Sequence, residues 1–457
     1  MESITRVVLI ILVFIGAVVT NSVTVDAQGR NEAAVSALER TPHVPNQVLV
    51  QFRFGVSEEA KESLRGRVEA DIDDVVVSQD RRSDFKGDLE LWNLPPGLAI
   101  AQAVRDLERD PTIEFVEPNW IYQHQATSDD PYYTNGSLWG MYGNDTSPSN
   151  LYGSQAGEAW ASRTDCSSVY VGIIDEGIQF SHTDLKDNIW TNPHDTVDGV
   201  DNDNNGYVDD THGWDFSGND NTIYDGGNGD KHGTHVAGTI GAKGGNKIGV
   251  AGVCWNIKLI SVKFLGKNGG TTANAIKAVN YVTDLKTRHG LNIVATNNSW
   301  GGGGYSIGLY DAIGRAGDAN ILFVAAAGNS GVNMESSPQY PASYDKANII
   351  SVAAIDKSGN LASWSNYGKT SVDLGAPGVS IWSTVPGKNG SSTYSSYSGT
   401  SMAAPHVTGA AALYSATNSN SNPTAADIKG AILSAVAQPG LLSGKTVTGG
   451  ILNICCP

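Results

Sequence analysis

Short, uniformly apolar runs alternate with helix-like segments from about residue 127 to the end of this 457-residue chain. Such runs are typical of strands buried on both faces of a parallel sheet, and the helices between them cover the two faces. Functional side chains in these sheets lie at the carboxyl ends of the strands. The sequence therefore predicts an α/β fold with a mostly parallel sheet. The predicted strands are residues 169–174, 259–264, 292–296, 321–327 and 349–353, and the predicted helices are residues 271–285 and 401–413.

Three segments of this region carry the residue types needed for nucleophilic catalysis. Ser401 lies at the start of a predicted small-residue helix with Pro405 expected in its first turn, Asp175 ends the first predicted strand, and His232 opens the stretch His-Gly-Thr-His. A serine hydroxyl needs a base to take its proton, and the imidazole needs a carboxylate to fix its tautomer. The chain order Asp, His, Ser is that of subtilisin and differs from the orders in chymotrypsin and α/β-hydrolases. A helix N-cap is the alternative role for Ser401.

With all three segments present, the chain resembles the subtilisin-like serine proteases, or subtilases. Residues 323–331 are similar to the strand and turn that carry the family's oxyanion-hole asparagine, which implies that role for Asn329, with a simple turn residue as the alternative. The resemblance implies a subtilisin-like fold and an endopeptidase that forms an acyl-enzyme on Ser401. The zinc pattern His-Glu-x-x-His is missing around His232 and His235, so a metal pair is not expected there. We expect His235 and His406 to be packed structural histidines, as the resemblance also implies for His235.

The resemblance further implies a substrate-binding segment. In the family this segment pairs with an extended peptide through main-chain hydrogen bonds, and here it contains Ser299, Trp300 and Gly301. Gln339 and Tyr340 are expected at the pocket for the residue before the cleaved bond. Because glutamine is polar but uncharged, we expect broad specificity rather than a preference for basic residues.

The chain before residue 127 has a different composition. Residues 1–27 have the layout of a secretory signal peptide, with one arginine, an apolar run over residues 7–19 and a polar end at Ala27. A membrane anchor is the alternative, but this apolar run is too short to span a bilayer comfortably. Residues 28–126 predict a small α+β domain similar to the subtilase propeptide, with an ordinary accessory domain as the alternative. The peptidase domain is then residues 127–457, and the resemblance implies autocatalytic cleavage within residues 123–128.

The region between Asp195 and Asp230 contains ten aspartates and no lysine or arginine. At its centre, side chains with oxygen atoms stand at alternate positions, and a glycine allows the chain to turn. A cation with six to eight oxygen ligands requires such an arrangement. An EF-hand would have glutamate at the twelfth position, where this chain has His212, so Asp209 or Asp210 would have to substitute. A solvated acidic loop is the alternative. The predicted ligands are Asp201, Asp203, Asn205, Tyr207, Asp209 and Asp210.

Another calcium site, around Asp184, is implied by the resemblance alone. Asp184 would contribute its side chain, and the loop of residues 244–250 would wrap the ion with the Asn246 side chain and main-chain carbonyls. Such ions would stabilise the mature enzyme by mass action, and no organic cofactor is expected. The main-chain ligands would be Gly244, Ile248 and Val250.

The net charge of −17 and the lack of a basic cluster disfavour nucleic acid as a partner and suit an exported, soluble protein. The expected partners are protein or peptide substrates and the chain's own propeptide, which acts as an intramolecular inhibitor. We expect the protein to be a monomer that does not contact the membrane once the signal peptide is removed. We expect secretion, with a lytic vacuolar or lysosomal compartment as the alternative. The four cysteines suit disulfides in such compartments and allow three full pairings.

The sequence therefore predicts a secreted serine endopeptidase of broad specificity, made as a self-processing zymogen. A catalytically silent, peptide-binding relative is the alternative from another class, and the intact triad with Asn329 argues against it. A non-peptide esterase is disfavoured by the peptide-pairing segment. One residue departs from the family pattern: Glu176 follows Asp175 where the family usually has a small hydroxyl residue, and its carboxylate is expected to raise the pKa of either Asp175 or His232.

Overall fold

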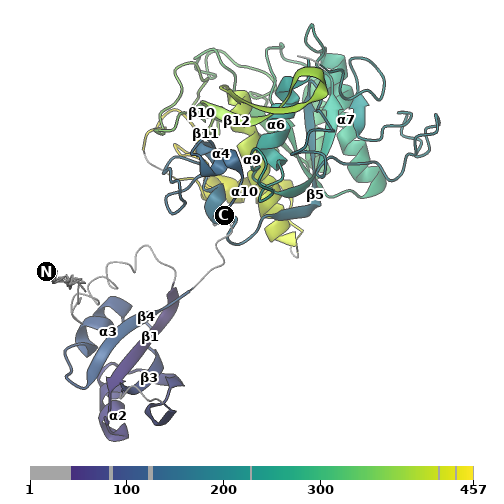
Figure 1. Cartoon of the computed structure of the whole chain (residues 1–457). Helices are drawn as coiled ribbons and strands as arrows, with labels where there is room; N and C mark the ends of the chain where they lie inside the picture. Colours follow the sequence, from purple (N-terminus) through teal and green to yellow (C-terminus); the bar gives the residue numbers. More distant parts are fainter. Residues whose placement is uncertain are drawn as a thin grey trace, which may run out of the picture. The chain divides into compact units, whose positions relative to one another are not determined.

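The computed structural model describes residues 43–81, 86–121, 127–226, 229–419, 422–437 and 440–455. The chain divides into two compact units, Met1–Gln123 and His124–Pro457, which are described separately (Figure 1). The predicted signal peptide, residues 1–27, and most of the predicted cleavage stretch, residues 123–128, lie outside the described residues. Within the described ranges, no helix combines the length and apolar character needed to cross a membrane.

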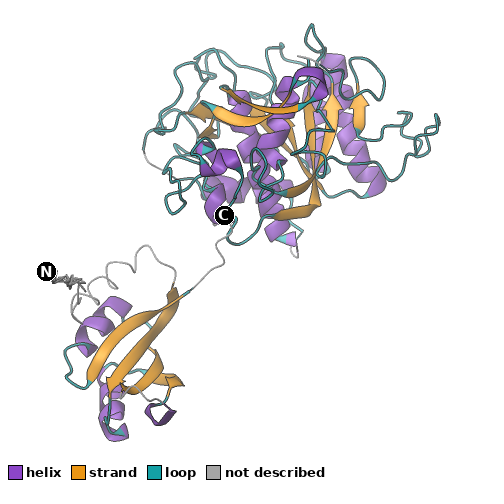
Figure 2. Cartoon of the chain, in the orientation of Figure 1, coloured by secondary structure: helices purple, strands orange, loops and turns teal. Residues whose placement is uncertain are grey.

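The N-terminal unit consists of β1 (His43–Arg53), α2 (Glu58–Arg67), β2 (Asp71–Val77), η1 (Gln79–Arg81), β3 (Lys86–Asn93), α3 (Ile100–Leu107) and β4 (Ile113–Trp120). Its four strands form an antiparallel sheet in the order β2-β3-β1-β4 (Figure 2). Alternate residues of β1, Val48, Val50 and Phe52, share one buried cluster with Leu64 of α2 and Leu107 of α3. The expected small α+β unit is confirmed. The sequence did not indicate β2, because its acidic residues are exposed along almost the whole strand.

The C-terminal unit is built on a parallel sheet with helices on both faces. Its strands are β5 (Asp165–Asp175), β6 (Gly213–Asp215), β7 (Asn256–Lys263), β8 (Ile293–Asn298), β9 (Leu322–Ala326), β10 (Ile349–Ile355), β11 (Leu374–Pro377), β12 (Ile381–Pro386) and β13 (Ser392–Tyr397). Its helices are α4 (Pro131–Thr134), η2 (Trp139–Met141), α5 (Ala156–Ala159), α6 (Lys231–Gly241), α7 (Thr272–His289), α8 (Ile307–Asp318), η3 (Lys388–Gly390), α9 (Thr400–Thr417) and α10 (Ala425–Ser434).

Seven of these strands form the sheet, in the order β11-β10-β9-β8-β5-β7-β6, and all their pairings are parallel. Helices α6, α9 and α10 belong to the hydrophobic cluster on one face, and α7 and α8 to the cluster on the other. Strands β12 and β13 form a separate antiparallel hairpin that contacts α6. The α/β architecture predicted from the sequence is confirmed.

Each of the five predicted strands overlaps a strand of the sheet, and the two predicted helices are α7 and α9. The edge strands β6 and β11 were not predicted, because three and four residues are too few to show a pattern. A disulfide joins Cys166 of β5 to Cys254, which precedes β7, and this is one of the cysteine pairs that the sequence left open.

Candidate active site

Asp175 and His232 meet at the carboxyl edge of the sheet. Asp175 is the last residue of β5, and its side chain is fully buried. His232 is the second residue of α6, and its Nδ1 lies 2.9 Å from Asp175 Oδ1 and 3.1 Å from Oδ2. The carboxylate can therefore hold the imidazole with Nδ1 protonated, which leaves Nε2 as the acceptor that a base needs.

Two glycines allow the strand end and the helix to approach so closely. Gly177 has a φ of 116°, and a Cβ there would lie 2.4 Å from Ile223 O. A Cβ on Gly233, the third residue of α6, would lie 2.3 Å from Gly177 O. A side chain at either position would push the first turn of α6 away from the end of β5.

Two carboxyl groups raise the pKa of His232. Burial opposes its protonation, but the charge and hydrogen bond of Asp175, together with the charge of Glu176, outweigh burial and raise the pKa of His232 above its ordinary value. Glu176 also accepts the backbone N–H of His232 at 3.1 Å, so its carboxyl group lies at the N-terminus of α6, where a negative charge is favourable. Burial raises the pKa of Glu176 itself. The effect expected of Glu176 on the triad is therefore present at His232.

Ser401 is the second residue of α9, and its hydroxyl donates to Ser299 O at 3.1 Å. Between the described side chains of Ser401 and His232 there is no hydrogen bond, so in this conformation the Ser401 hydroxyl is directed to Ser299 O and not to the imidazole. The Ser299 hydroxyl in turn donates to Ser401 O at 2.9 Å. That carbonyl has no helical partner because Pro405, four residues on, lacks an N–H. Pro405 thus lies in the second turn of α9, and the expectation that it lies in the first turn was wrong.

Asn329 follows β9 and is anchored by the residue before Ser401. Its Oδ1 accepts the Thr400 N–H at 2.9 Å and the Thr400 hydroxyl at 3.0 Å. Thr400 Oγ1 also accepts the Gly328 N–H at 3.0 Å, which ties the turn after β9 to the start of α9. With Oδ1 engaged, Nδ2 is the polar atom left to donate to a substrate oxygen, and Asn329 and Ser401 line the same pocket.

This pocket has a volume of about 320 Å³ and brings together the predicted substrate-binding residues Ser299, Trp300, Gly301, Gln339 and Tyr340. Gly302 N–H donates to Tyr340 O at 3.2 Å, which closes one wall. The Gln339 amide donates to the main-chain oxygens of residues 337 and 338. The described residues that line the pocket carry no charge. A larger groove of about 1080 Å³ lies along the β12–β13 hairpin and contains none of the predicted catalytic residues.

Comparison with known proteins agrees with this geometry. A family model described as the subtilase family, Peptidase S8, matches residues 167–449. The chain belongs to the subtilase family. A second model, the fervidolysin N-terminal prodomain, matches residues 29–119. This subtilase is therefore a subtilisin-like serine protease with an N-terminal prodomain, as the sequence predicted.

Several characterised subtilases are similar along much of their length. The thermophilic serine proteinase of Bacillus sp. (strain AK1) is 33% identical over 383 residues, which cover 84% of this chain and 80% of the relative. Thermitase of Thermoactinomyces vulgaris is 35% identical over 288 residues, or 63% of this chain and 85% of the relative. Among solved structures, a protease from Pseudoalteromonas arctica PAMC 21717 has a TM-score of 0.57 and 29% identity, over 72% of this chain and 98% of that chain.

His235 and His406 of the subtilase are both fully buried. The His235 ring stacks on Tyr397 with centroids 4.5 Å apart, and burial lowers its pKa to about 3. His406 Nδ1 lies 2.9 Å from Met402 O, and burial lowers the pKa of His406 to about 4. Both rings are therefore neutral near pH 7, which fits the packing role that the sequence predicted for them.

Asp184, a predicted calcium ligand, contacts the loop of residues 244–250, which contains the other ligands predicted for this site, Gly244, Asn246, Ile248 and Val250. Asp184 Oδ1 accepts Asn246 Nδ2–H at 2.8 Å, and Oδ2 accepts the Val250 N–H at 2.9 Å. Burial raises the pKa of Asp184 to about 6.

Asp130 is a member of this cluster that the sequence did not reveal. Its buried carboxylate accepts the backbone N–H groups of Gly245 at 2.8 Å and of Asn246 at 3.1 Å. Because Asp130 directly precedes Pro131 of α4, its local sequence is typical of a helix N-cap. No local pattern shows that the carboxylate reaches a loop 115 residues away.

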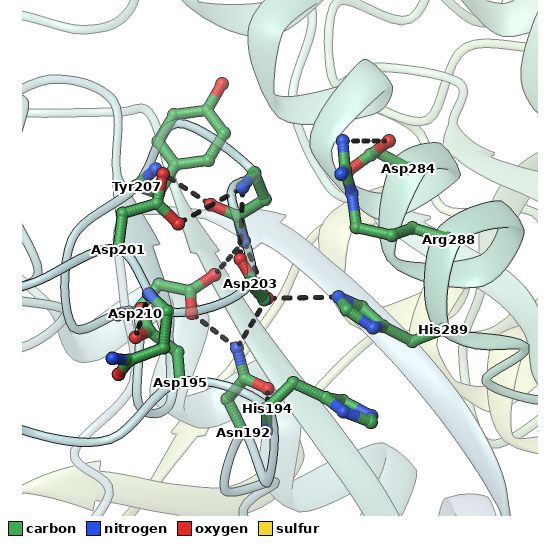
Figure 3. Close-up of polar contacts among 12 residues, drawn as sticks. Asn192, His194, Asp195, Asp201, Asp203, Tyr207, Asp210, Asp284, Arg288 and His289 are labelled. Carbon is green, nitrogen blue, oxygen red and sulfur yellow. Dashed lines mark hydrogen bonds and ion pairs between the residues drawn. The ribbon is translucent and has the colours of Figure 1, made fainter.

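The acidic loop forms a second cluster (Figure 3). The Asn205 N–H donates to Asp201 Oδ1 and to Asp203 Oδ1, both at 3.1 Å. Asp210 Oδ2 accepts the Asn205 side-chain amide at 3.0 Å, and the Tyr207 N–H donates to Asn205 Oδ1 at 2.7 Å. Five of the six predicted ligands therefore lie in contact with one another.

Asp209 is the exception, because its carboxylate accepts the backbone N–H groups of Asp198 and Gly199, each at 3.0 Å, and is turned to that part of the loop. Of the two candidates for the missing glutamate, only Asp210 joins the cluster. The structure adds Asn192 and His289, which the sequence did not indicate: the Asn192 amide donates to Asp210, and His289 Nε2 lies 3.0 Å from Asp203 Oδ2 (Figure 3).

Neither cluster is complete as a set of carboxylate and imidazole ligands. Among the described residues, no three His, Cys, Asp or Glu side chains are placed so that they could hold one metal ion. An ion at either place would therefore need amide and main-chain oxygens as additional ligands, which are the donors that calcium accepts and zinc rarely uses.

Proposed function

We propose that this subtilase is a secreted endopeptidase that cuts peptide bonds with Ser401 as nucleophile, His232 as general base and acid, and Asp175 as the carboxylate that orients the imidazole. The observation that carries the proposal is the 2.9 Å contact between His232 Nδ1 and Asp175 at the carboxyl edge of the sheet. The turn after β9 leaves the same edge, and Asn329 in this turn lines one pocket together with Ser401. The prodomain match supports synthesis as a zymogen.

In the proposed mechanism, the Ser401 hydroxyl leaves Ser299 O, gives its proton to His232 Nε2 and attacks the substrate carbonyl. The negative oxygen of the tetrahedral intermediate accepts hydrogen bonds from Asn329 Nδ2 and from the Ser401 N–H. His232 then protonates the leaving amine, and a water molecule hydrolyses the acyl-enzyme by the same steps in reverse order. Asp175 stabilises the imidazolium without taking its proton.

The substrate is a polypeptide in extended conformation, with its main chain alongside residues 299–301 and one side chain in the pocket of about 320 Å³. The uncharged lining supports broad specificity rather than selection of a charged residue. The signal peptide is residues 1–27, the propeptide residues 28–126 and the peptidase residues 127–457, and the propeptide inhibits the peptidase until the chain is cut within residues 123–128. Secretion, rather than delivery to a lytic compartment, fits the extracellular proteases among its relatives.

The role of Asn329 predicts the effect of Asn329→Asp. The carboxylate keeps the acceptor for Thr400 but removes the donor and brings a negative charge to the oxyanion. We expect kcat for a peptide substrate to fall at least about 10²- to 10³-fold, with KM changed little. Steady-state kinetics measure this effect, and Ser336→Ala, at an exposed position outside the pocket, is the control. Parent-like kcat in Asn329→Asp would remove this residue from the mechanism.

The position of Glu176 predicts a pH effect. Ionised Glu176 raises the pKa of His232, and activity requires the neutral imidazole. In Glu176→Gln the pKa of His232 therefore falls, and the acid limb of the kcat/KM profile moves to lower pH. The amide keeps an oxygen for the His232 N–H, so the alkaline limb and the melting temperature should change little. If the acid limb of the kcat/KM profile does not move in Glu176→Gln, the charge of Glu176 does not affect the pKa of His232.

We further propose that both oxygen-rich clusters bind calcium with a structural role. Asp184, Asn246, Asp130 and the main-chain oxygens of residues 244, 248 and 250 would form the first site. Asp201, Asp203, Asn205, Tyr207 and Asp210 would form the second. Support comes from the donor chemistry, since buried carboxylates and amides converge in each cluster and neither has a lysine or arginine as ion-pair partner among the described residues. A bound cation would supply that missing positive charge.

Calcium removal is expected to destabilise the mature protein. At a calcium concentration a hundredfold above the dissociation constant, one site stabilises the folded state by about 2.7 kcal/mol, which is lost on chelation. Thermal unfolding with and without chelator measures this loss. Asp184→Asn should reduce the difference, whereas Asp187→Asn, which is exposed and close in sequence, should not. A melting temperature that changes neither with added calcium nor with added chelator would contradict the proposal.

Labelling with a sulfonyl fluoride tests the proposed function directly, because an activated serine attacks the sulfur and expels fluoride. We expect one label per mature molecule, located by peptide mapping at Ser401, with loss of casein hydrolysis in proportion to labelling. A label on another serine, or casein hydrolysis that survives complete labelling of Ser401, would contradict the assignment. Absence of both label and hydrolysis would favour the silent peptide-binding relative.

A further inference from the structure

A buried lysine that the proposed mechanism does not use lies beside the triad. Lys263 is the last residue of β7, pairs with Asp175 in the sheet register, and has a side chain that is only 3% exposed. Its Nζ donates to Asp230 Oδ1 at 2.8 Å and to Asp225, and lies 3.8 Å from Asp215 Oδ2. Such partners are required, because a buried ammonium without them is strongly destabilising.

Asp230 connects this lysine to the helix that carries His232. It is the N-cap residue of α6, two positions before His232, and its side chain is fully buried. The carboxylate does not cap its own helix. Instead, Oδ1 accepts from Lys263, and Oδ2 accepts the backbone N–H groups of Asp225 at 2.9 Å and Gly226 at 3.1 Å. The side chain therefore links the end of β7 to the start of α6.

The turn after Asp175 packs on the same ion pair. A Cβ on Gly177 would lie 2.9 Å from Asp230 Oδ1 and 3.0 Å from Lys263 Cδ. The end of β5, the end of β7 and the first turn of α6 are therefore in contact at one point, so a displacement of Asp230 would move His232 relative to Asp175.

We propose that Lys263 and Asp230 are positioning residues whose buried ion pair holds the first turn of α6 where His232 Nδ1 meets the Asp175 carboxylate. The inference rests on the proposed role of His232 as the base. Asp225 offers a matched comparison, because it contacts the same Nζ with a side chain that is 56% exposed and that belongs to the loop before α6. Loss of its charge leaves the link between β7 and α6 in place.

The test compares Lys263→Met, Asp230→Asn and Asp225→Asn in the full chain, each with the same engineered protease site within residues 122–126, so that prodomain removal does not depend on activity. A displacement of about 1 Å in a catalytic group lowers the rate by about a hundredfold. We therefore expect kcat to fall by about ten- to a hundredfold in Lys263→Met and Asp230→Asn, with KM within about threefold of the parent. Asp225→Asn should stay within about twofold in both constants.

The pH profile separates positioning from general stability. The charged and titratable groups that face His232 are Asp175, Glu176 and His235, and all three are unchanged in these variants. If the ion pair positions His232, its contact with Asp175 weakens and the acid limb of kcat/KM moves to lower pH. A lower melting temperature with parent-like kcat and an unmoved acid limb would overturn the inference. Asp230→Asn, which keeps the side-chain volume, decides the question if Lys263→Met does not fold.

Failure of the proposed function can be distinguished from failure of this inference. If Ser401→Ala or Asp175→Asn retains parent activity, the proposed function is wrong and the positioning role falls with it. If both are inactive while Lys263→Met and Asp230→Asn keep the parent kcat, only the positioning role is wrong.

Discussion

Replacing Ser401 with alanine is expected to lower kcat for a peptide substrate by about six orders of magnitude, the size of the loss found when subtilisin loses its nucleophile. Without the hydroxyl no acyl-enzyme forms, and His232 has no proton to take from the protein. The pocket and the Asn329 amide stay in place, so KM should remain within a few-fold of the parent. A residual rate above that in water is expected from the oxyanion hole and binding alone.

This comparison requires mature protein that does not depend on its own activity for processing. Both proteins therefore carry the same engineered protease site within residues 122–126. Ser396→Ala serves as the matched control, because Ser396 is exposed and lies only five residues before Ser401. An alanine variant that keeps more than about a thousandth of the parent kcat would show that another group is the nucleophile.

Replacing Asp175 with asparagine is expected to lower kcat by about 10⁴-fold. The amide has almost the shape of the carboxylate, so the buried end of β5 should keep its packing. However, an asparagine NH₂ facing His232 Nδ1 favours the tautomer with the proton on Nε2, and that nitrogen can then no longer accept the proton of Ser401. Loss of the charge of Asp175 also lowers the pKa of His232, so the acid limb of the profile should move to lower pH.

The control for this variant is Asp187→Asn, which removes an exposed carboxylate elsewhere in the same domain and should leave kcat unchanged. Because a buried carboxylate can also matter for stability, melting temperatures must accompany the kinetics. Asp175→Asn with a normal melting temperature and a kcat within tenfold of the parent would contradict the proposed role.

The sequence predicted those parts of the site that each depend on one short segment. Asp175 ends an apolar run, Asn329 follows another, and Ser401 begins a small-residue helix, so local pattern was sufficient to place them at one edge of a parallel sheet. The family resemblance then supplied their roles. The short edge strands β6 and β11 were missed because their length gives no periodicity, and the environment of Pro405 depended on Ser299, a residue distant in sequence.

What the sequence could not predict is pairing between side chains far apart in the chain. Lys263 meets Asp230 across 33 residues, and Asp130 meets the loop at Gly245 across 115 residues. In the acidic loop, composition suggested a ligand role for Asp209, but its carboxylate caps backbone groups at residues 198 and 199 instead. Such choices depend on backbone turns that residue spacing alone does not define.

The central claim is that Ser401 makes this chain a self-processing peptidase, and the most direct test is the intact mass of residues 28–457 expressed with calcium, beside the Ser401→Ala form. The account predicts that only the parent loses an N-terminal segment ending near residue 126, and that the shortened protein digests casein. Two full-length proteins that cleave neither casein nor a small ester, or equal processing of both forms, would contradict it.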